Sequence, residues 1–136
     1  MNSHKIILGF DPGRDKCGVA VLTKNLTLHY HQVVTAENAI AKIGQLISQF
    51  EVELIVMGNL TTSQSWHDQL KSAFTDLPVE MVNEQNSTLE ARDRYWQMYP
   101  PQGFQKLIPQ SLRLPPRPID DIVAILLIER YLSANS

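Results

Sequence analysis

The stretch ILGFDPGRDKCGVAVL, residues 7–22, contains two apolar runs joined by a short polar turn. The first run ends on Asp11, a Pro-Gly turn follows, and the second run begins at Gly18. Short runs rich in Ile, Val and Leu that are bounded by turn residues predict β-strands, here over residues 5–10 and 18–23. The position of Asp11 raises a question, because a strand with a buried character ends on a carboxylate.

The rest of the sequence predicts an alternation of helices and strands. A third strand is expected over residues 26–34, so the first three strands form an antiparallel meander. Apolar residues at helical spacing then predict a helix over residues 35–50, with Thr35 as its N-cap. Further along, we expect a buried parallel strand at 52–58, a helix near 66–74 and a strand at 79–82. The next helix is expected from just after Glu84 to about Met98, with Ser87 and Glu90 as a capping box. A final helix should begin near Pro118. This order predicts an α/β fold, with a mixed five-stranded sheet in βββαβαβα order flanked by helices.

The composition is that of an ordinary globular protein. The 136 residues are 43% hydrophobic and 19% charged, which fits one domain over residues 1–136. No apolar stretch approaches the roughly 20 residues needed to cross a bilayer, and no secretory signal is visible, so we expect no membrane partner and a cytoplasmic location. The single cysteine, Cys17, excludes an internal disulfide and a multi-cysteine zinc site, and we expect it to be a packed thiol.

Residues 99–118 include six prolines among twenty residues, so they cannot form a regular helix or a central strand. We expect a long loop, and long loops in compact domains are usually functional or disordered. This loop overlaps the most basic part of the chain. Residues 92–117 carry five basic residues and one acidic residue, although the whole chain has a net charge of −2. A local positive surface can meet phosphates even when the protein is mildly acidic.

Four carboxylates stand at positions that suggest a metal site. Asp11 follows an apolar strand, Glu84 follows the strand VEMV, and Asp120 and Asp121 begin the most apolar helix. The carboxyl ends of strands in an open α/β sheet are where such sheets bind ligands. Magnesium and manganese prefer oxygen ligands, and two such ions about 4 Å apart can clamp the oxygens of a phosphoryl displacement.

Each of these carboxylates also has a simpler explanation. An aspartate before Pro-Gly is a common turn residue, which would account for Asp11. Glu84 could be a solvated charge in front of the next helix. Asp120 and Asp121 could serve only the helix dipole. Adjacent helical positions lie about 100° apart, so only one of these two aspartates is expected to be the principal ligand.

Four motifs occur in the order, and at about the spacing, of the YqgF family of Holliday junction resolvases, within the ribonuclease H-like superfamily. They are DPGRDKCGVAV (11–21), VMGNLTT (56–62), NEQNSTLEA (83–91) and IDDIVAILLIERYL (119–132). The chain resembles this family over nearly its whole length. It departs from the family pattern where Asp15-Lys16 replaces a basic pair, where Asn83 and Gln85 flank Glu84, and after Asn59, where the family's proline is missing. The related RuvC resolvases carry a glutamate near the end of the fourth strand, where this chain has Gly58 and Asn59.

The resemblance implies a ribonuclease H-like sheet and a metal-dependent nuclease. By position, Asp11, Glu84 and Asp120 resemble the catalytic, metal-binding carboxylates, and Asp121 is an additional metal-ligand candidate. Mg²⁺ or Mn²⁺ is the implied cofactor, with Asp11 bridging two ions. Four basic residues are candidates for contacts with the nucleic-acid backbone: Lys16, Arg92, Arg94 and Arg117.

The resemblance leaves two substrates open, four-way DNA junctions and the 5′ end of precursor 16S ribosomal RNA. Junction resolution usually requires a two-fold dimer, whereas RNA trimming can be done by a monomer. The sequence shows no spare dimer helix, which slightly favours RNA, and both monomer and homodimer stay open. A catalytically silent nucleic-acid or protein-binding module on the same scaffold is the alternative function. An actin-like ATPase is a third reading, but the chain is too short for the paired domains of those enzymes.

Overall fold

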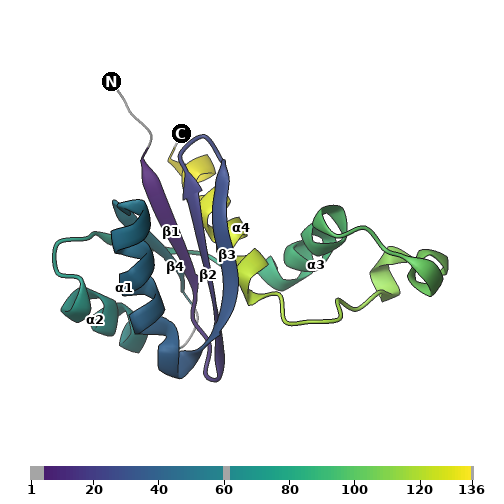
Figure 1. Cartoon of the computed structure of the whole chain (residues 1–136), viewed down its shortest axis with the longest axis horizontal. Helices are drawn as coiled ribbons and strands as arrows, with labels where there is room; N and C mark the ends of the chain where they lie inside the picture. The colour runs from purple at the N-terminus through teal and green to yellow at the C-terminus, as the bar shows by residue number, and fades with distance from the viewer. Residues whose placement is uncertain (1–4, 60–61, 136) are drawn as a thin grey trace.

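The computed structural model describes residues 5–59 and 62–135, which form one mixed sheet with helices on both faces (Figure 1). In chain order the elements are β1 (Ile6–Asp11), β2 (Lys16–Thr23), β3 (Leu28–Thr35), the 3-10 turn η1 (Ala36–Asn38), α1 (Ala39–Phe50), β4 (Leu54–Gly58), α2 (Ser63–Ala73), β5 (Val79–Val82), α3 (Ser87–Met98), the 3-10 turns η2 (Gly103–Leu107) and η3 (Gln110–Leu112), and α4 (Asp120–Ala134). The predicted α/β fold and its order of elements are confirmed.

The five strands lie in the order β3-β2-β1-β4-β5. The first three strands pair antiparallel, and β1–β4 and β4–β5 pair parallel. The meander and the parallel extension predicted from the sequence are therefore both present. The centre of the sheet is the most apolar part, because β1 and β4 are covered on both faces and read as continuous buried runs.

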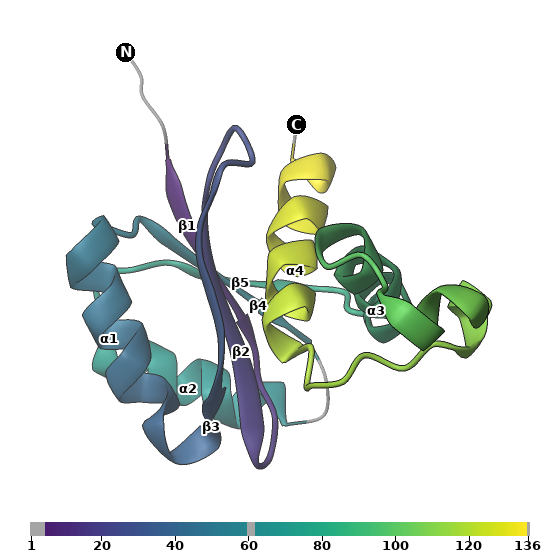
Figure 2. The same cartoon turned by 45° about the vertical axis from the view of Figure 1, so that its right-hand side comes forward.

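Helices cover both faces of the sheet (Figure 2), and a hydrophobic layer lies beneath the helices on each face. One face packs against α1 and α2 through side chains such as Leu8, Phe10 and Ile43. The other face packs against α4, with α3 outside it, through side chains such as Ile7, Ile122 and Leu127. Because side chains alternate along β1, the odd-numbered positions 7, 9 and 11 point to the α4 face. This alternation places Asp11 beneath the first turn of α4.

Two predicted helix caps are wrong. Thr35 pairs with Lys16 at the end of the β2–β3 ladder and occupies the N-cap of the 3-10 turn η1, without a side-chain capping bond. The N-cap of α1 itself is Asn38. Ser87 is the first residue of α3 and is buried, so Asn86 occupies the N-cap in a left-handed conformation. Glu90 reaches Arg130 of α4 instead of the helix start. Tertiary pairing replaced local capping in both cases.

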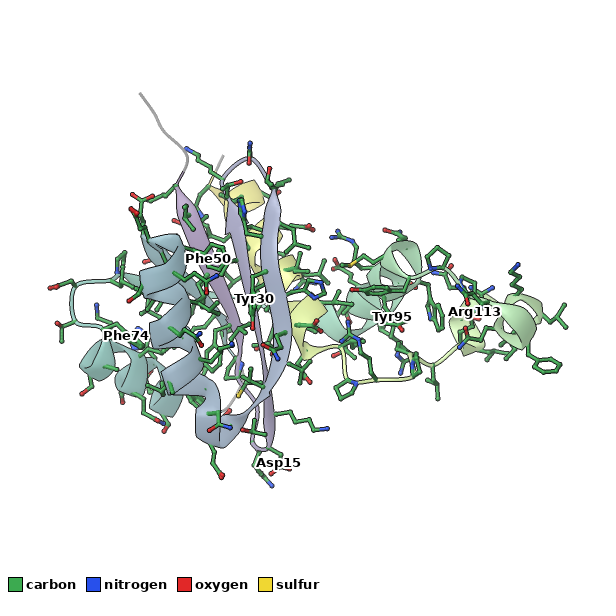
Figure 3. The ribbon with its side chains drawn as sticks, in the orientation of Figure 1. Asp15, Tyr30, Phe50, Phe74, Tyr95 and Arg113 are labelled. Carbon is green, nitrogen blue, oxygen red and sulfur yellow. The ribbon has the colours of Figure 1, made fainter. Side chains whose placement is uncertain are left out.

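Residues 99–118, here named the proline-rich arm, project away from the sheet beyond α3 (Figure 1). The expected absence of regular helix and strand holds, since only the short turns η2 and η3 form. Arg113 lies far out on the arm (Figure 3) and donates to the carbonyls of Gln105 and Ile108, both at 2.8 Å. Six large apolar or aromatic side chains of the arm are exposed: Tyr99, Phe104, Leu107, Ile108, Leu112 and Leu114.

Two smaller expectations concern Cys17 and membrane spans. Cys17 is fully buried, and its sulfur lies 3.4 Å from the Gly13 N–H, so the thiol packs against the turn after β1. Burial raises the pKa of this thiol. Among the helices of residues 5–59 and 62–135, none is long and apolar enough to cross a bilayer.

Candidate functional site

Asp11 is the last residue of β1, the central strand, and two glycines on the neighbouring strands flank it. Gly18 of β2 is its antiparallel partner, and Phe10 pairs with Met57, which places Gly58 of β4 at the other side of Asp11. Asp11 is 8% exposed, so its carboxyl lies in the protein and not in a solvated turn. The missing side chains of the two glycines leave space above the sheet on either side of this carboxyl.

Glu84 fills the space above Gly58. A Cβ added to Gly58 would lie 1.8 Å from the Oε1 atom of Glu84, so any larger residue at this position would collide with the carboxyl. The backbone N–H of Glu84 lies 3.4 Å from the Oδ1 atom of Asn59, at the end of β4. Glu84 is 6% exposed, which excludes its alternative explanation as a solvated charge.

Asp120 occupies the space above Gly18. A Cβ added to Gly18 would lie 1.8 Å from the backbone oxygen of Asp120, so the first turn of α4 rests directly on β2. Gly9 of β1 allows a similar close approach one turn further along α4, since a Cβ there would lie 2.4 Å from the backbone oxygen of Ala124. These close approaches seat the helix on the sheet and bring Asp120 to Asp11.

The carboxyl of Asp11 interacts with both of the others. Burial, followed by the charges of Glu84 and Asp120 and hydrogen bonds with both, raises the pKa of Asp11 to about 9. Burial also raises the pKa of Asp120, against the opposing effect of its hydrogen bond with Asp11 and of the nearby Lys16. Like charges in a desolvated site cannot all ionise at low cost, so Asp11 keeps its proton at neutral pH unless a cation takes its place.

The three acids of the cluster offer only oxygen atoms as possible metal ligands. Within the described part of the chain, no group of three or more His, Cys, Asp or Glu side chains is already arranged to hold a metal ion. The carboxyl of Asp11 instead interacts with the carboxyls of Glu84 and Asp120. Carboxylate oxygens without nitrogen or sulfur partners are the ligands preferred by Mg²⁺ and Mn²⁺, so the donor chemistry fits these cations.

Asp121 is placed apart from the other three carboxylates. It is 2% exposed, its Oδ2 atom lies 2.6 Å from the Nδ1 atom of His31, and its Oδ1 atom accepts from Arg117 at 2.9 Å. The helical rotation between Asp120 and Asp121 explains the division, because one faces β1 and the other faces β3. Both oxygens of Asp121 are engaged by these partners, and its role as a metal ligand stays a prediction.

The four basic candidates differ in their surroundings. Lys16 is exposed at the start of β2, near Asp120. Arg92 is half-buried on α3, beside the arm residues Gln110 and Ser111. Arg94 donates two hydrogen bonds of 2.8 Å to Glu129, so it joins α3 to α4, and its contact with nucleic acid stays a prediction. Arg117 is bound to Asp121, but about a third of its side chain stays exposed.

The sequence prediction missed three contributors to this region. Gly18 and Gly58 were read only as strand ends, although their spacing around Asp11 in the expected sheet could have indicated a crowded site. His31 stood in an unremarkable strand, and nothing local indicated its contact with a residue ninety positions away. Leu60 and Thr61, within the quoted motif 56–62, lie outside the described residues.

Comparison with solved structures agrees with this architecture. The fowlpox virus resolvase, solved with Holliday junction DNA, superposes with a TM-score of 0.68 over 96% of this chain and 98% of its own, at 13% identity. RuvC from Thermus thermophilus superposes with a TM-score of 0.59 over 95% of this chain and 94% of its own, at 14% identity. These likenesses show the fold, which is ribonuclease H-like.

Curated relatives are also similar over most of the chain. A protein of Coxiella burnetii named "Putative pre-16S rRNA nuclease" is 27% identical and covers 96% of this chain and 94% of its own length. A protein of Bordetella petrii with the same name is 27% identical, with 96% and 97% covered.

The mixed sheet, with carboxylates meeting at the ends of β1 and β5 and at the start of α4, defines the class of ribonuclease H-like proteins. The family model described as RuvX, Holliday junction resolvase, matches residues 5–134. The chain therefore belongs to the RuvX family, also called the YqgF family, and the predicted resemblance is confirmed. Resolvases hydrolyse phosphodiester bonds of nucleic acid.

Proposed function

We propose that this protein is a nuclease that hydrolyses phosphodiester bonds in structured nucleic acid with the help of divalent cations. The observation that carries the proposal is the contact of the Asp11 carboxyl with the carboxyls of Glu84 and Asp120. Two buried acids, Asp11 and Glu84, beside the half-buried Asp120 are unfavourable for folding, which is understandable where function needs them. A silent binding module would gain nothing from this cluster.

The cations that fit are Mg²⁺ and Mn²⁺. Nucleases and resolvases of this kind generally use divalent metal ions. Asp11 lies between the other two carboxyls and would be the shared ligand, with Glu84 and Asp120 on either side. When bound, a pair of such ions stabilises the attacking and leaving oxygens of a phosphoryl displacement. Lys16, beside Asp120, would hold the phosphate backbone without reading the sequence.

The substrate class is structured RNA or branched DNA. The names of the curated relatives favour precursor 16S rRNA, and the family description favours four-way junctions. The exposed apolar side chains of the proline-rich arm offer a contact surface that the sequence did not reveal, so a homodimer is as open as a monomer. Precursor 16S rRNA is our first choice of substrate.

The test compares cleavage of a precursor 16S rRNA 5′ segment and a four-way DNA junction in Mg²⁺, Mn²⁺ and EDTA. We expect cation-dependent cleavage of the RNA by the natural chain. Glu84→Gln and Asp120→Asn should each reduce it at least about 100-fold, because each removes a charged oxygen donor. The control is Asp68→Asn, the same kind of change on a carboxylate that is 71% exposed on α2.

Cleavage of the junction and not of the RNA would transfer the proposal to DNA. If neither nucleic acid is cut, or if Glu84→Gln and Asp68→Asn behave alike, the nuclease assignment to this site is wrong. Cation titration followed by thermal unfolding gives an independent readout, because a silent module should show no stabilisation that depends on Asp11.

Gly58→Ala should damage the site with little damage to the fold. The new Cβ would meet the Glu84 carboxyl at 1.8 Å, and this carboxyl ends a flexible side chain that can swing away. We expect the melting temperature to change by no more than about 3 °C and cleavage to fall at least about 30-fold. Circular dichroism and the same cleavage assay measure the two effects. Full activity would show that Glu84 need not lie above Gly58.

A further inference from the structure

A cavity of about 470 Å³ lies beside the carboxylate cluster, between β3 and the first turn of α4. Lys16, His31 and Arg117 line it together with Val33, Pro118 and Asp121. The start of α4 lies beside β3 (Figure 1), where Asp121 contacts His31. Asp121 follows Asp120 directly, and Lys16 acts electrostatically on Asp120, so the cavity adjoins the proposed catalytic site.

The polar side of the cavity is held in place by a connected network. The buried Asp121 binds His31 at 2.6 Å and Arg117 at 2.9 Å, through its two separate oxygens. The hydroxyl of Tyr99 lies 3.4 Å from the other ring nitrogen of His31. The Arg117 guanidinium lies over the rings of Tyr95 and Tyr99, with 5.4 and 5.7 Å to the ring centres. Residues of β3, α3, the proline-rich arm and α4 thus hold the side chains of His31 and Arg117 in place before any ligand arrives.

The lining of the cavity is of two kinds. Lys16 and Arg117 carry positive charge against the single carboxylate of Asp121, which leaves the polar side attractive to an anion. Val33 and Pro118 provide an apolar wall, and neither is fully buried. The volume lies within the range of small-molecule sites, which is roughly 300 to 1,000 Å³. A group with an anionic end and a flat apolar body has the matching chemistry.

We propose that this cavity binds the nucleotide next to the scissile phosphate, with its base against Val33 and Pro118 and its phosphate at Lys16 and Arg117. The inference rests on the proposed nuclease function. Only an unpaired base can enter such a cavity, since a paired base is covered by its neighbours in the duplex. The enzyme would therefore prefer a cut site beside an unpaired or splayed nucleotide, as found at RNA ends and at junction centres.

The test removes the base from the substrate and, separately, fills the cavity in the protein. An abasic nucleotide is placed in turn on each side of the cut in the substrate that the natural chain cleaves. At one of the two positions we expect KM to rise about tenfold, the order that one stacked base contributes, with kcat within about twofold. Val33→Trp should raise KM for the intact substrate by a similar factor.

The two changes should not add, because both remove the same contact. Val33→Trp should therefore be insensitive to the abasic position. Leu28→Trp is the matched control, since Leu28 is exposed on the same strand and outside the cavity, and it should keep the KM and the abasic effect of the natural chain. Binding is then measured on chains that carry Asp11→Asn, with 2-aminopurine in the substrate at the same position. The fluorescence should change on binding to the chain that also carries Leu28→Trp, and it should not change on binding to the chain that also carries Val33→Trp.

Three results would overturn the inference. Cleavage that ignores the abasic nucleotide on both sides of the cut would leave the nuclease intact and the cavity without this role. Additive effects of the abasic nucleotide and Val33→Trp would place the base elsewhere. If the natural chain cleaves neither nucleic acid, the proposed nuclease function is wrong, and the proposal that a nucleotide binds in the cavity fails with it. The abasic series needs no protein variant, so a misfolded Val33→Trp chain would not decide the matter.

Discussion

Replacing Asp11 with asparagine is expected to abolish cleavage and, at the same time, to make the cation-free protein more stable. The loss of activity should be about a thousandfold or more, the upper order for removal of one preorganised charged group. Asp11 is the carboxyl that contacts both Glu84 and Asp120, so its replacement affects every proposed metal contact. Asparagine has nearly the same shape as aspartate, so the substitution tests the loss of the negative charge.

The gain in stability follows from the pKa of Asp11. This pKa rises from 3.8 to about 9 on folding, so the folded chain keeps a proton that the unfolded chain releases. The free energy of unfolding therefore falls as the pH rises from about 4 to about 9. Asparagine does not titrate, so Asp11→Asn should lose this dependence. At pH 8 in EDTA we expect a gain of about 2 kcal/mol, or about 6 °C in melting temperature.

Thermal unfolding at several pH values, with and without Mn²⁺, measures both parts of this prediction. The advantage of Asp11→Asn should grow between pH 5 and pH 9 in EDTA. Saturating cation should stabilise the natural chain by about 2 to 3 kcal/mol at a hundredfold excess over Kd and should stabilise the variant much less. Asp68→Asn should match the natural chain throughout. A variant less stable than the natural chain at pH 8 in EDTA would contradict the assigned burial of this charge.

Gly18→Ala should have the largest effect on folding. Its Cβ would lie 1.8 Å from the oxygen, 2.1 Å from the carbonyl carbon of Asp120 and 2.6 Å from the nitrogen of Asp121. All three are backbone atoms, so α4 must shift away from β2. We expect a loss of about 3 kcal/mol, or about 10 °C in melting temperature, because overpacking of this kind displaces the backbone. Cleavage should fall as well, since Asp120 moves with the helix.

Gly44→Ala is the matched control for this substitution. Gly44 lies inside α1, and its added Cβ would meet the ring of Phe74 at 3.4 and 3.6 Å, which are ordinary contacts. Alanine is the better helix former, so this variant should be more stable by about 0.5 to 1 kcal/mol. Chemical denaturation measures both variants. Equal effects at the two glycines would show that the close approach of α4 to Gly18 is not required.

Much of the fold was predictable because its signals are local. The apolar runs that became β1, β2 and β4 and the apolar face of α1 are visible in windows of a few residues. The order of the elements then leaves few topologies, since parallel connections are right-handed and short strands pair with their neighbours. The helix caps failed for the opposite reason. Thr35 and Glu90 took partners far away in the sequence, which local rules do not see.

By itself, the sequence determined that carboxylates follow two strands and begin the last helix, because the positions where elements end are written in local patterns. Only the tertiary structure decided which of them meet. Asp120 turns towards Asp11 and Asp121 towards His31, since a rotation of about 100° on one helix selects different neighbours on the sheet. The close seating of that helix on Gly18, and of Glu84 on Gly58, depends on distances between backbones that no local pattern contains. That the chain is one domain stays a prediction.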